Sequence, residues 1–373
     1  MSAAVVLATV VAATACSTDA PAPAGPDRSS EPTPSATTTP GGATSTTVDF
    51  GDGPQTTGFP DCAELLPGDL AAGVVPDVRP VDVVADVAHV AGSEAFLPAA
   101  GGVTCSLSNG VAPLDDPVPG GRDQPVYEGV SLTVLPAGGA ALTAHREFDG
   151  SGAPSDCTAS DAARVYCDAD VPAGDAWVSL STTRLQDDDD ATPEQAQPAF
   201  DALLATVVDH VATTRLGTAE GDGGADDGSI TTCDAGNVNA VTGTTLSVGP
   251  FPNSSAPPET TDFARNRVGA DSCVFVSTDE GSGYTSAGAL YTHLPGGGWV
   301  AEQRLAAGTI DRGDRLDVPG LGAGDAAWRT CDETACSVDV VHDGDWTHWL
   351  LFADVAPDTS TAIAGWVGTS VAD

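Results

Sequence analysis

The densest group of chemically versatile side chains is a stretch of seven residues, His342 to His348, which holds two histidines and two aspartates. Imidazole and carboxylate groups in such proximity are typical of metal sites. Asp343-Gly344, however, is a strong two-residue hairpin turn. Because side chains alternate along a strand, the hairpin places His342 and His348 on opposite faces of the sheet. We therefore predict no metal site and no cofactor.

The same hairpin register predicts a candidate ligand site. It pairs Asp339 with His348 and places both on one face with Trp346, while the opposite face is apolar. A half-exposed Trp346 beside the Asp339–His348 pair could bind a sugar or a peptide by stacking and hydrogen bonding. The alternative is that a helix or the other domain covers this face. Five of the six tryptophans fall in the second half of the chain, which favours that half for binding.

Other sequence patterns do not indicate catalysis. The four aspartates Asp187 to Asp190 lack the spacing of a calcium loop and are interpreted as a solvated segment before a helix. The glycines at 320, 322 and 324 are interpreted as a tight turn. All thirteen basic residues are arginine, so lysine-dependent chemistry is excluded. Neither Gly-x-Ser-x-Gly nor His-Glu-x-x-His occurs, and we predict that the protein is not an enzyme.

Eight of the nine cysteines fall into two sets of four, and the spacing within the two sets is nearly the same. Corresponding members are 168 to 174 residues apart, which indicates a duplicated domain. Paired cysteines in a chain of this kind are typical of exported proteins, and no thiol would then remain as a nucleophile. Eight cysteines allow many pairings, but the duplication favours pairing within each repeat. We predict the disulfides Cys62–Cys105, Cys157–Cys167, Cys233–Cys273 and Cys331–Cys336.

Hydrophobic periodicity predicts the elements that carry these cysteines. The first repeat is expected to hold a helix starting at Cys62, strands near 102–108 and 127–135, and a helix over 140–148. Its closing helix has Thr192 and Gln195 in capping-box positions and an apolar stripe made of Phe200, Leu203, Leu204, Val207 and Val211. Ile363, Trp366, Val367 and Val371 give a weaker stripe in the second repeat. We predict an α+β fold with two similar domains, each an antiparallel sheet with packed helices, stapled by disulfides.

The N-terminal region predicts export and anchoring. The apolar run 3–13 is too short to span a bilayer but suits a signal peptide. It leads to Ala13-Thr14-Ala15-Cys16, which resembles a bacterial lipobox, whose cysteine is acylated on its thiol; the alternative is an ordinary cleavable signal. The predicted domains are a signal peptide over 1–16, a disordered Ser/Thr/Pro-rich tether over 17–60, repeats over 61–216 and 230–373, and a linker over 217–229.

Two motifs carry a resemblance to a known group. Asp61-Cys62-Ala63-Glu64-Leu65-Leu66, followed later by Cys105, and Val318-Pro319-Gly320-Leu321-Gly322, leading to Asp325-Ala326-Ala327-Trp328, resemble actinobacterial cell-envelope lipoproteins of unknown function. The resemblance implies an exported, anchored domain in which a cysteine-led helix is bridged to the first strand. It implies no catalytic residues. The first repeat lacks the Gly-Leu-Gly turn, and its Gly174-Asp175-Ala176-Trp177 aligns with Gly344-Asp345-Trp346.

The net charge of −40 repels phosphate backbones and disfavours a nucleic-acid partner. We expect a lipid-anchored protein on the outer face of the cytoplasmic membrane, whose tandem non-catalytic domains bind a ligand, an envelope protein or a glycan. The first alternative is a structural or accessory subunit of an envelope or sensor complex, which a broad exposed apolar patch would favour. The second is a wall-polymer hydrolase, which a concave pocket with clustered carboxylates would favour.

Overall fold

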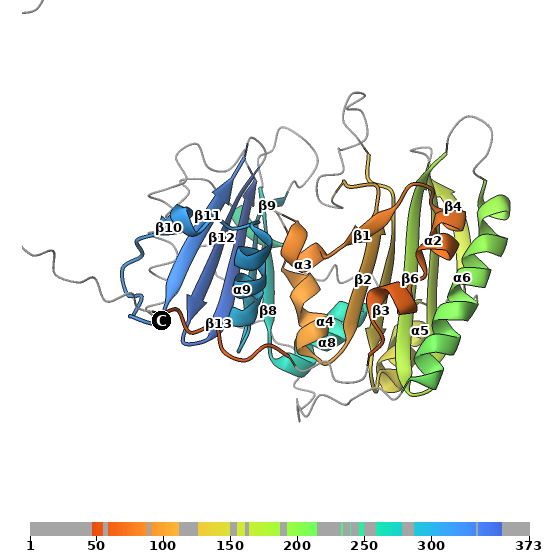
Figure 1. The fold of residues 1–373 in the computed structure, drawn as a ribbon, viewed down its shortest axis with the longest axis horizontal. Helices are drawn as coiled ribbons and strands as arrows, with labels where there is room; N and C mark the ends of the chain where they lie inside the picture. The colour runs from red at the N-terminus through yellow and green to blue at the C-terminus, as the bar shows by residue number, and fades with distance from the viewer. Residues whose placement is uncertain are drawn as a thin grey trace, which may run out of the picture. The chain divides into compact units, whose positions relative to one another are not determined.

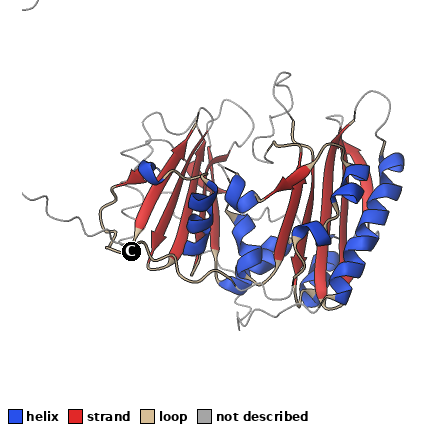
Figure 2. Cartoon of the chain, viewed as in Figure 1, coloured by secondary structure: helices blue, strands red, loops and turns tan. Residues whose placement is uncertain are grey.

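The fold consists of two antiparallel sheets with helices packed on them, in a computed structural model of the chain (Figure 2). The structure describes residues 47–54, 59–87, 90, 92–111, 126–149, 155–160, 164–186, 192–214, 233, 239, 246–249, 259–277, 287–332 and 335–352. Cys16, Asp187 to Asp190, the linker 217–229 and the apolar stripe 363–371 lie outside these residues. The predicted α+β class is confirmed.

The first sheet has the strand order β1-β2-β3-β6-β5-β4. Alternate residues on its central strands, including Cys105, Leu132 and Leu180, point into a core that the helices α1, α2 and α6 also line. The strands are β1 (Arg79–Val81), β2 (Val103–Ser108), β3 (Gly129–Leu135), β4 (Ser155–Ser160), β5 (Arg164–Ala173) and β6 (Ala176–Leu185), and the helices are α1 (Cys62–Leu65), α2 (Gly68–Val74), α5 (Gly139–Asp149) and α6 (Pro193–Thr213).

The closing helix α6 forms as its sequence predicts. The Thr192 hydroxyl accepts a hydrogen bond from the Gln195 backbone N–H, and the Gln195 side chain accepts one from the Thr192 N–H, at 3.4 and 3.0 Å. Pro198 lies within the helix without ending it. The predicted apolar stripe from Phe200 to Val211 is buried against the sheet.

The second sheet has the order β10-β11-β12-β13-β9-β8-β7. Asp343 and Gly344 both have positive φ, 52° and 83°, as a two-residue hairpin turn between β12 and β13 requires. The predicted pairing of Asp339 with His348 is confirmed. The strands are β7 (Leu246–Gly249), β8 (Asp271–Ser277), β9 (Ala287–Leu294), β10 (Arg315–Leu316), β11 (Ala326–Cys331), β12 (Ala335–His342) and β13 (Asp345–Phe352), with helices α8 (Thr260–Val268) and α9 (Gly298–Ala307).

The two sheets correspond strand by strand around their disulfides. The order β2-β3-β6-β5-β4 in the first sheet matches β8-β9-β13-β12-β11 in the second. All four predicted cysteine pairs are bonded, with Cα–Cα separations between 4.0 and 5.8 Å. Cys157–Cys167 and Cys331–Cys336 each join directly opposed residues of a hairpin, as predicted.

Helices of each half pack against elements of the other half (Figure 1). From the first half, α3 (Val83–Asp86) contacts α9, and α4 (Phe96–Ala99) contacts α8. In return, α8 of the second half contacts β3, and Phe263 lies edge-on to Trp177 of β6 with ring centroids 5.7 Å apart. Residues 46–373 therefore form one compact unit.

Close packing at this contact requires a glycine. Gly92 has a φ of +87°, in the left-handed region, and lies over Thr292 of β9. A Cβ atom at position 92 would lie 2.7 Å from the Thr292 side chain. Any side chain at this position would push the strap of residues 83–97 away from the second sheet.

The C-terminal part of the segment predicted to be a disordered tether is ordered, at residues 47–54 and 59–60. We predicted disorder over 17–60, but Asp49 donates its backbone N–H to the Gly324 carbonyl at 2.9 Å. The Phe50 ring also stacks on Trp328, with centroids 6.2 Å apart. Val48 and Phe50 supply the apolar surface that the Ser/Thr/Pro-rich segment before them lacks, and so they pack on the second sheet.

Candidate functional site

The predicted ligand site in the second sheet is buried. Trp346 has no exposed surface, and Asp339 and His348 are each 1% exposed. The expectation of a half-exposed Trp346 is therefore wrong, and the alternative, a covered face, is correct. The cover consists of α9 and of the strap of residues 83–97 from the first half.

These buried residues form a charge network centred on Asp339. Its Oδ1 atom accepts hydrogen bonds from Trp346 Nε1 at 2.9 Å and His348 Nδ1 at 3.1 Å, and Arg304 Nε lies 3.3 Å away. Burial alone would raise the pKa of Asp339, but the charges of Arg304 and His348 and the two hydrogen bonds lower it to about 2. The carboxylate is therefore ionised at neutral pH.

The network ties the strap to the second sheet. Arg304 donates to the carbonyls of Val84 and Val87, at 2.9 and 3.0 Å. His348 Nε2 lies 3.1 Å from the Val90 carbonyl, so its two ring nitrogens face two acceptors, one on the strap and one on Asp339. The predicted ligand-binding residues are therefore structural: they hold the halves together.

The first sheet carries a second copy of this motif. Trp177 Nε1 donates to Asp170 Oδ1 at 2.7 Å, and Trp177 follows Asp170 by seven residues, as Trp346 follows Asp339. His145 of α5 takes the place of Arg304, with its Nε2 3.4 Å from the Asp170 carboxylate. His145 is the seventh residue of α5, as Arg304 is of α9. This copy is more open, because the Asp170 side chain is 26% exposed.

Beside this motif, one face of the first sheet is covered with hydroxyl groups. Ser106, Ser131 and Ser181 lie directly opposite one another on β2, β3 and β6. The rows on either side add further hydroxyl side chains from the same strands, namely Thr104, Thr133 and Ser179 in one row and Ser108 and Thr183 in the other. The three serines lie on three adjacent strands and make this face of the sheet polar.

The second sheet has aliphatic residues at the corresponding places. Val274 directly follows Cys273, as Ser106 follows Cys105, and it pairs with Leu290, which pairs with Leu350. The row of three serines in the first sheet is thus a row of valine and two leucines in the second. The same fold tolerates large apolar side chains at these positions, so the hydroxyl face is not a requirement of the architecture.

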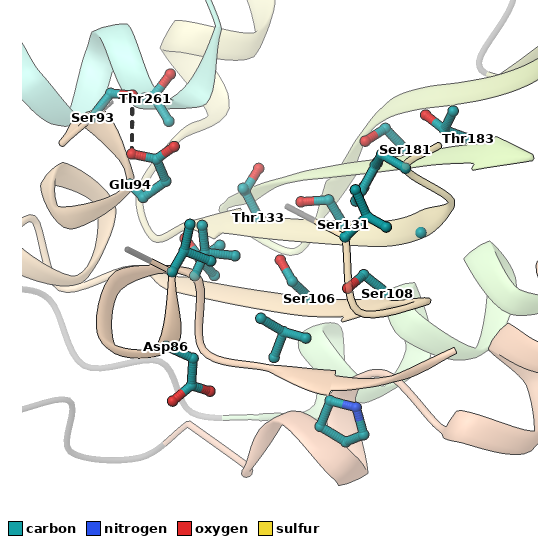
Figure 3. A pocket seen from close by; sticks show the side chains of 18 of the residues that line it. Asp86, Ser93, Glu94, Ser106, Ser108, Ser131, Thr133, Ser181, Thr183 and Thr261 are labelled. Carbon is teal, nitrogen blue, oxygen red and sulfur yellow. Dashed lines mark hydrogen bonds between the residues drawn. The ribbon is translucent and has the colours of Figure 1, made fainter. Parts of the chain in front are cut away.

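The hydroxyl face forms the floor of a cavity of about 900 Å³. At the end near the Thr133 row lie Ser93, Glu94 and Thr261 (Figure 3). Thr133 and Thr260, at the start of α8, are joined by a hydrogen bond of 2.9 Å. The opposite end, beside Ser108 and Thr183, is lined by Arg79, Gly110 and Tyr127.

The cavity is electrostatically asymmetric. Burial raises the pKa of Glu94, although the nearby charge of His348 lowers it in part. The pKa of Glu259 is raised by burial and by the neighbouring carboxylates of Asp262 and Asp170. Next to Ser181 on β5, burial and the charges of Asp170 and Asp156 raise the pKa of Asp168 to about 6. Glu94 and Glu259 thus lie at one end of a cavity whose other end has Arg79, while Asp168 lies on the neighbouring strand β5 and is not one of the lining residues.

The sequence analysis does not predict this cavity, because it places ligand binding in the tryptophan-rich second half. Four of those tryptophans, Trp299, Trp328, Trp346 and Trp349, are buried core residues. The available signal was the alternation of hydroxyl and apolar residues in 104–108, 131–134 and 178–183. Such alternation predicts a half-polar strand, but a polar face open to solvent and one lining a cavity have the same pattern.

Asp325, His342 and Asp343 lie close enough together to face a common ion. Asp325 already accepts from the backbone N–H groups of Gly322 and Asp343 and lies 2.9 Å from His342 Nδ1. Burial would raise its pKa, and these contacts lower it overall. The group therefore braces the turn between β10 and β11 against the β12–β13 hairpin. As predicted from the register, His342 and His348 lie on opposite faces.

No protein-family model, curated protein or solved structure matches this chain. Among the residues that the structure describes, no helix is long and apolar enough to cross a bilayer. The function is therefore argued from the geometry of the chain itself.

The network around Asp339 predicts an unequal effect of two equivalent substitutions. Asp339→Asn leaves Arg304 and His348 buried beside a neutral amide, and we expect the free energy of unfolding to fall by about 3–5 kcal/mol. Asp170→Asn, at the corresponding and partly exposed position, should lower it by about 1 kcal/mol. Urea denaturation followed by tryptophan fluorescence measures both. Equal losses would contradict a structural role specific to Asp339.

Proposed function

We propose that this chain is an exported, lipid-anchored protein of the bacterial cell envelope, and that its first sheet binds a small polar ligand in the hydroxyl-lined cavity. The observation that carries the proposal is the replacement of an aliphatic row in one sheet by a serine row in the other, beneath a cavity of about 900 Å³. A volume of this size is within the range of sites for small molecules.

The lining suits a ligand with many hydrogen-bonding groups. Each serine or threonine hydroxyl both donates and accepts, and it can rotate to fit either role. The cavity holds one aromatic residue, Tyr127, among the residues that line it. Recognition would therefore depend on hydrogen bonds and charge more than on stacking.

The comparison between the sheets supplies a variant that closes the cavity. Ser131→Leu/Ser181→Leu introduces the residues found at the equivalent positions 290 and 350, which should pack side by side across β3 and β6. In a thermal-shift screen of neutral oligosaccharides, amino acids, polyamines and short peptides, at least one class should raise the melting temperature of the wild type by a few degrees. The same class should leave the double-leucine variant unchanged.

Ser131→Ala/Ser181→Ala is the matched control, because it removes the same hydroxyl groups without filling the cavity. It should weaken binding but retain it. A ligand that shifts the double-leucine variant as much as the wild type binds elsewhere, and that result would overturn the assignment of the site.

The anchor is tested at Cys16. The four disulfides of the fold are favoured in an oxidising compartment outside the cytoplasm, which supports export. In the native host, the mature wild-type chain should start at an acylated Cys16 and fractionate with the membrane, whereas Cys16→Ser should be released or remain unprocessed. Mass spectrometry of the membrane-extracted protein measures this. An N-terminus elsewhere, with an unmodified Cys16 removed, would refute the anchor.

Hydrolysis of a wall polymer is a second candidate function, favoured by the two carboxyl groups with raised pKa, Glu94 and Glu259, in one cavity. A carboxyl group with a raised pKa can act as a general acid toward a glycosidic bond. A hydrolase would release reducing ends from purified cell-wall glycan, and Glu94→Gln would abolish the release. We expect no release above background from the wild type.

A contact surface of an envelope complex has less support. Among the described residues, the large hydrophobic side chains that are exposed are Phe148 and Val248. Phe148 lies on helix α5 of the first half and Val248 on strand β7 of the second, and these two side chains form no broad apolar patch.

A further inference from the structure

We infer that the ligand of the hydroxyl-lined cavity is a short zwitterionic peptide, with its ammonium group at the Glu94–Glu259 end and its carboxylate at Arg79. This inference rests on the proposed function and names the ligand class for the same site. It follows from the charges at the two ends, from the distance between them and from the hydroxyl floor that joins them.

The first end favours a cation. Glu94 is half-buried and Glu259 is solvent-accessible, and both line the cavity beside the Thr133–Thr260 hydrogen bond. The N-terminus of α8 also points here, but it contributes roughly half a positive charge. Two carboxyl groups outweigh that contribution when both are ionised, and a bound ammonium group would favour their ionised forms.

The second end favours an anion. Arg79 is exposed at the start of β1, opposite Ser108, and its guanidinium group makes no hydrogen bond or ion pair with the residues that the structure describes. Gly110 leaves room for it, because a Cβ atom at position 110 would lie 2.7 Å from Arg79 Nη2. A planar guanidinium group of this kind matches the two oxygens of a carboxylate.

The spacing of the ends sets the length of the ligand. Ser108, which faces Arg79, and Thr104, which pairs with Thr133, are four residues apart on β2. At roughly 3.3 Å per residue, the two rows are about 13 Å apart, the length of an extended peptide of about four residues. The intervening row of Ser106, Ser131 and Ser181 offers donors and acceptors for peptide N–H and carbonyl groups.

Tetra-alanine is a suitable probe because it has the inferred length and charges and no side-chain functional groups. We expect isothermal titration calorimetry on the full-length protein to show binding of tetra-alanine. N-acetylated tetra-alanine, which lacks the ammonium group, and tetra-alanine amide, which lacks the carboxylate, should each bind about tenfold more weakly or worse.

Substitutions assign each charge to its end of the cavity. Glu94→Gln and, separately, Glu259→Gln should weaken tetra-alanine binding but have little further effect on the N-acetylated peptide. Arg79→Gln should weaken tetra-alanine binding but have little further effect on the amide. This pattern is a double-mutant cycle between protein and ligand, and a merely structural effect of a substitution would weaken all three peptides alike.

Cellotetraose, a neutral polyhydroxyl probe of comparable length, separates the two proposals. Equal affinity for the free and blocked peptides overturns the zwitterion inference, as does failure of tetra-alanine to bind. If cellotetraose binds the wild type but not the double-leucine variant, the cavity is a ligand site of another class and the proposed function stands. The proposed function fails only if cellotetraose and the thermal-shift panel also give no binding at this cavity.

Discussion

One ionised carboxylate, that of Asp339, determines how the two halves of this protein hold together. Removing such a group from water is expensive, and it is tolerated because the Arg304 guanidinium group, His348 and Trp346 surround it. Arg304 also donates to the carbonyls of Val84 and Val87, and the second ring nitrogen of His348 faces the carbonyl of Val90. The buried charge of the second sheet is therefore satisfied only when the strap from the first half is in place.

The two copies of the Trp–Asp–cation motif lie in the same architecture but have different surroundings. In the second sheet, Arg304 reaches across to the strap, and the face around the motif is closed by packing. In the first sheet, the shorter His145 takes the cation position, and serines replace the aliphatic row beside it. The buried charge network surrounds the copy in the second sheet, and the polar cavity lies beside the copy in the first sheet.

Much of the fold could be predicted from the sequence because its signals are local. The cysteine spacing, the Asp343-Gly344 turn, the capped α6 helix and the pairing of Asp339 with His348 each depend on residues close in sequence or on a nearly constant repeat distance. What covers each face depends on contacts between distant segments, such as His348 with Val90. No periodicity within one strand records such a contact, and so the sequence predicts a ligand site on the face that is buried and does not indicate the cavity over the hydroxyl face.

A segment of each half covers the tryptophan side of the other half's sheet. The strap of the first half completes the core around Trp346, while α8 of the second half completes the core around Trp177. Such mutual exchange is what two identical subunits make when they trade segments across a two-fold axis. Either half produced alone would therefore expose the tryptophan side of its sheet, and we expect it to associate with a second copy of itself.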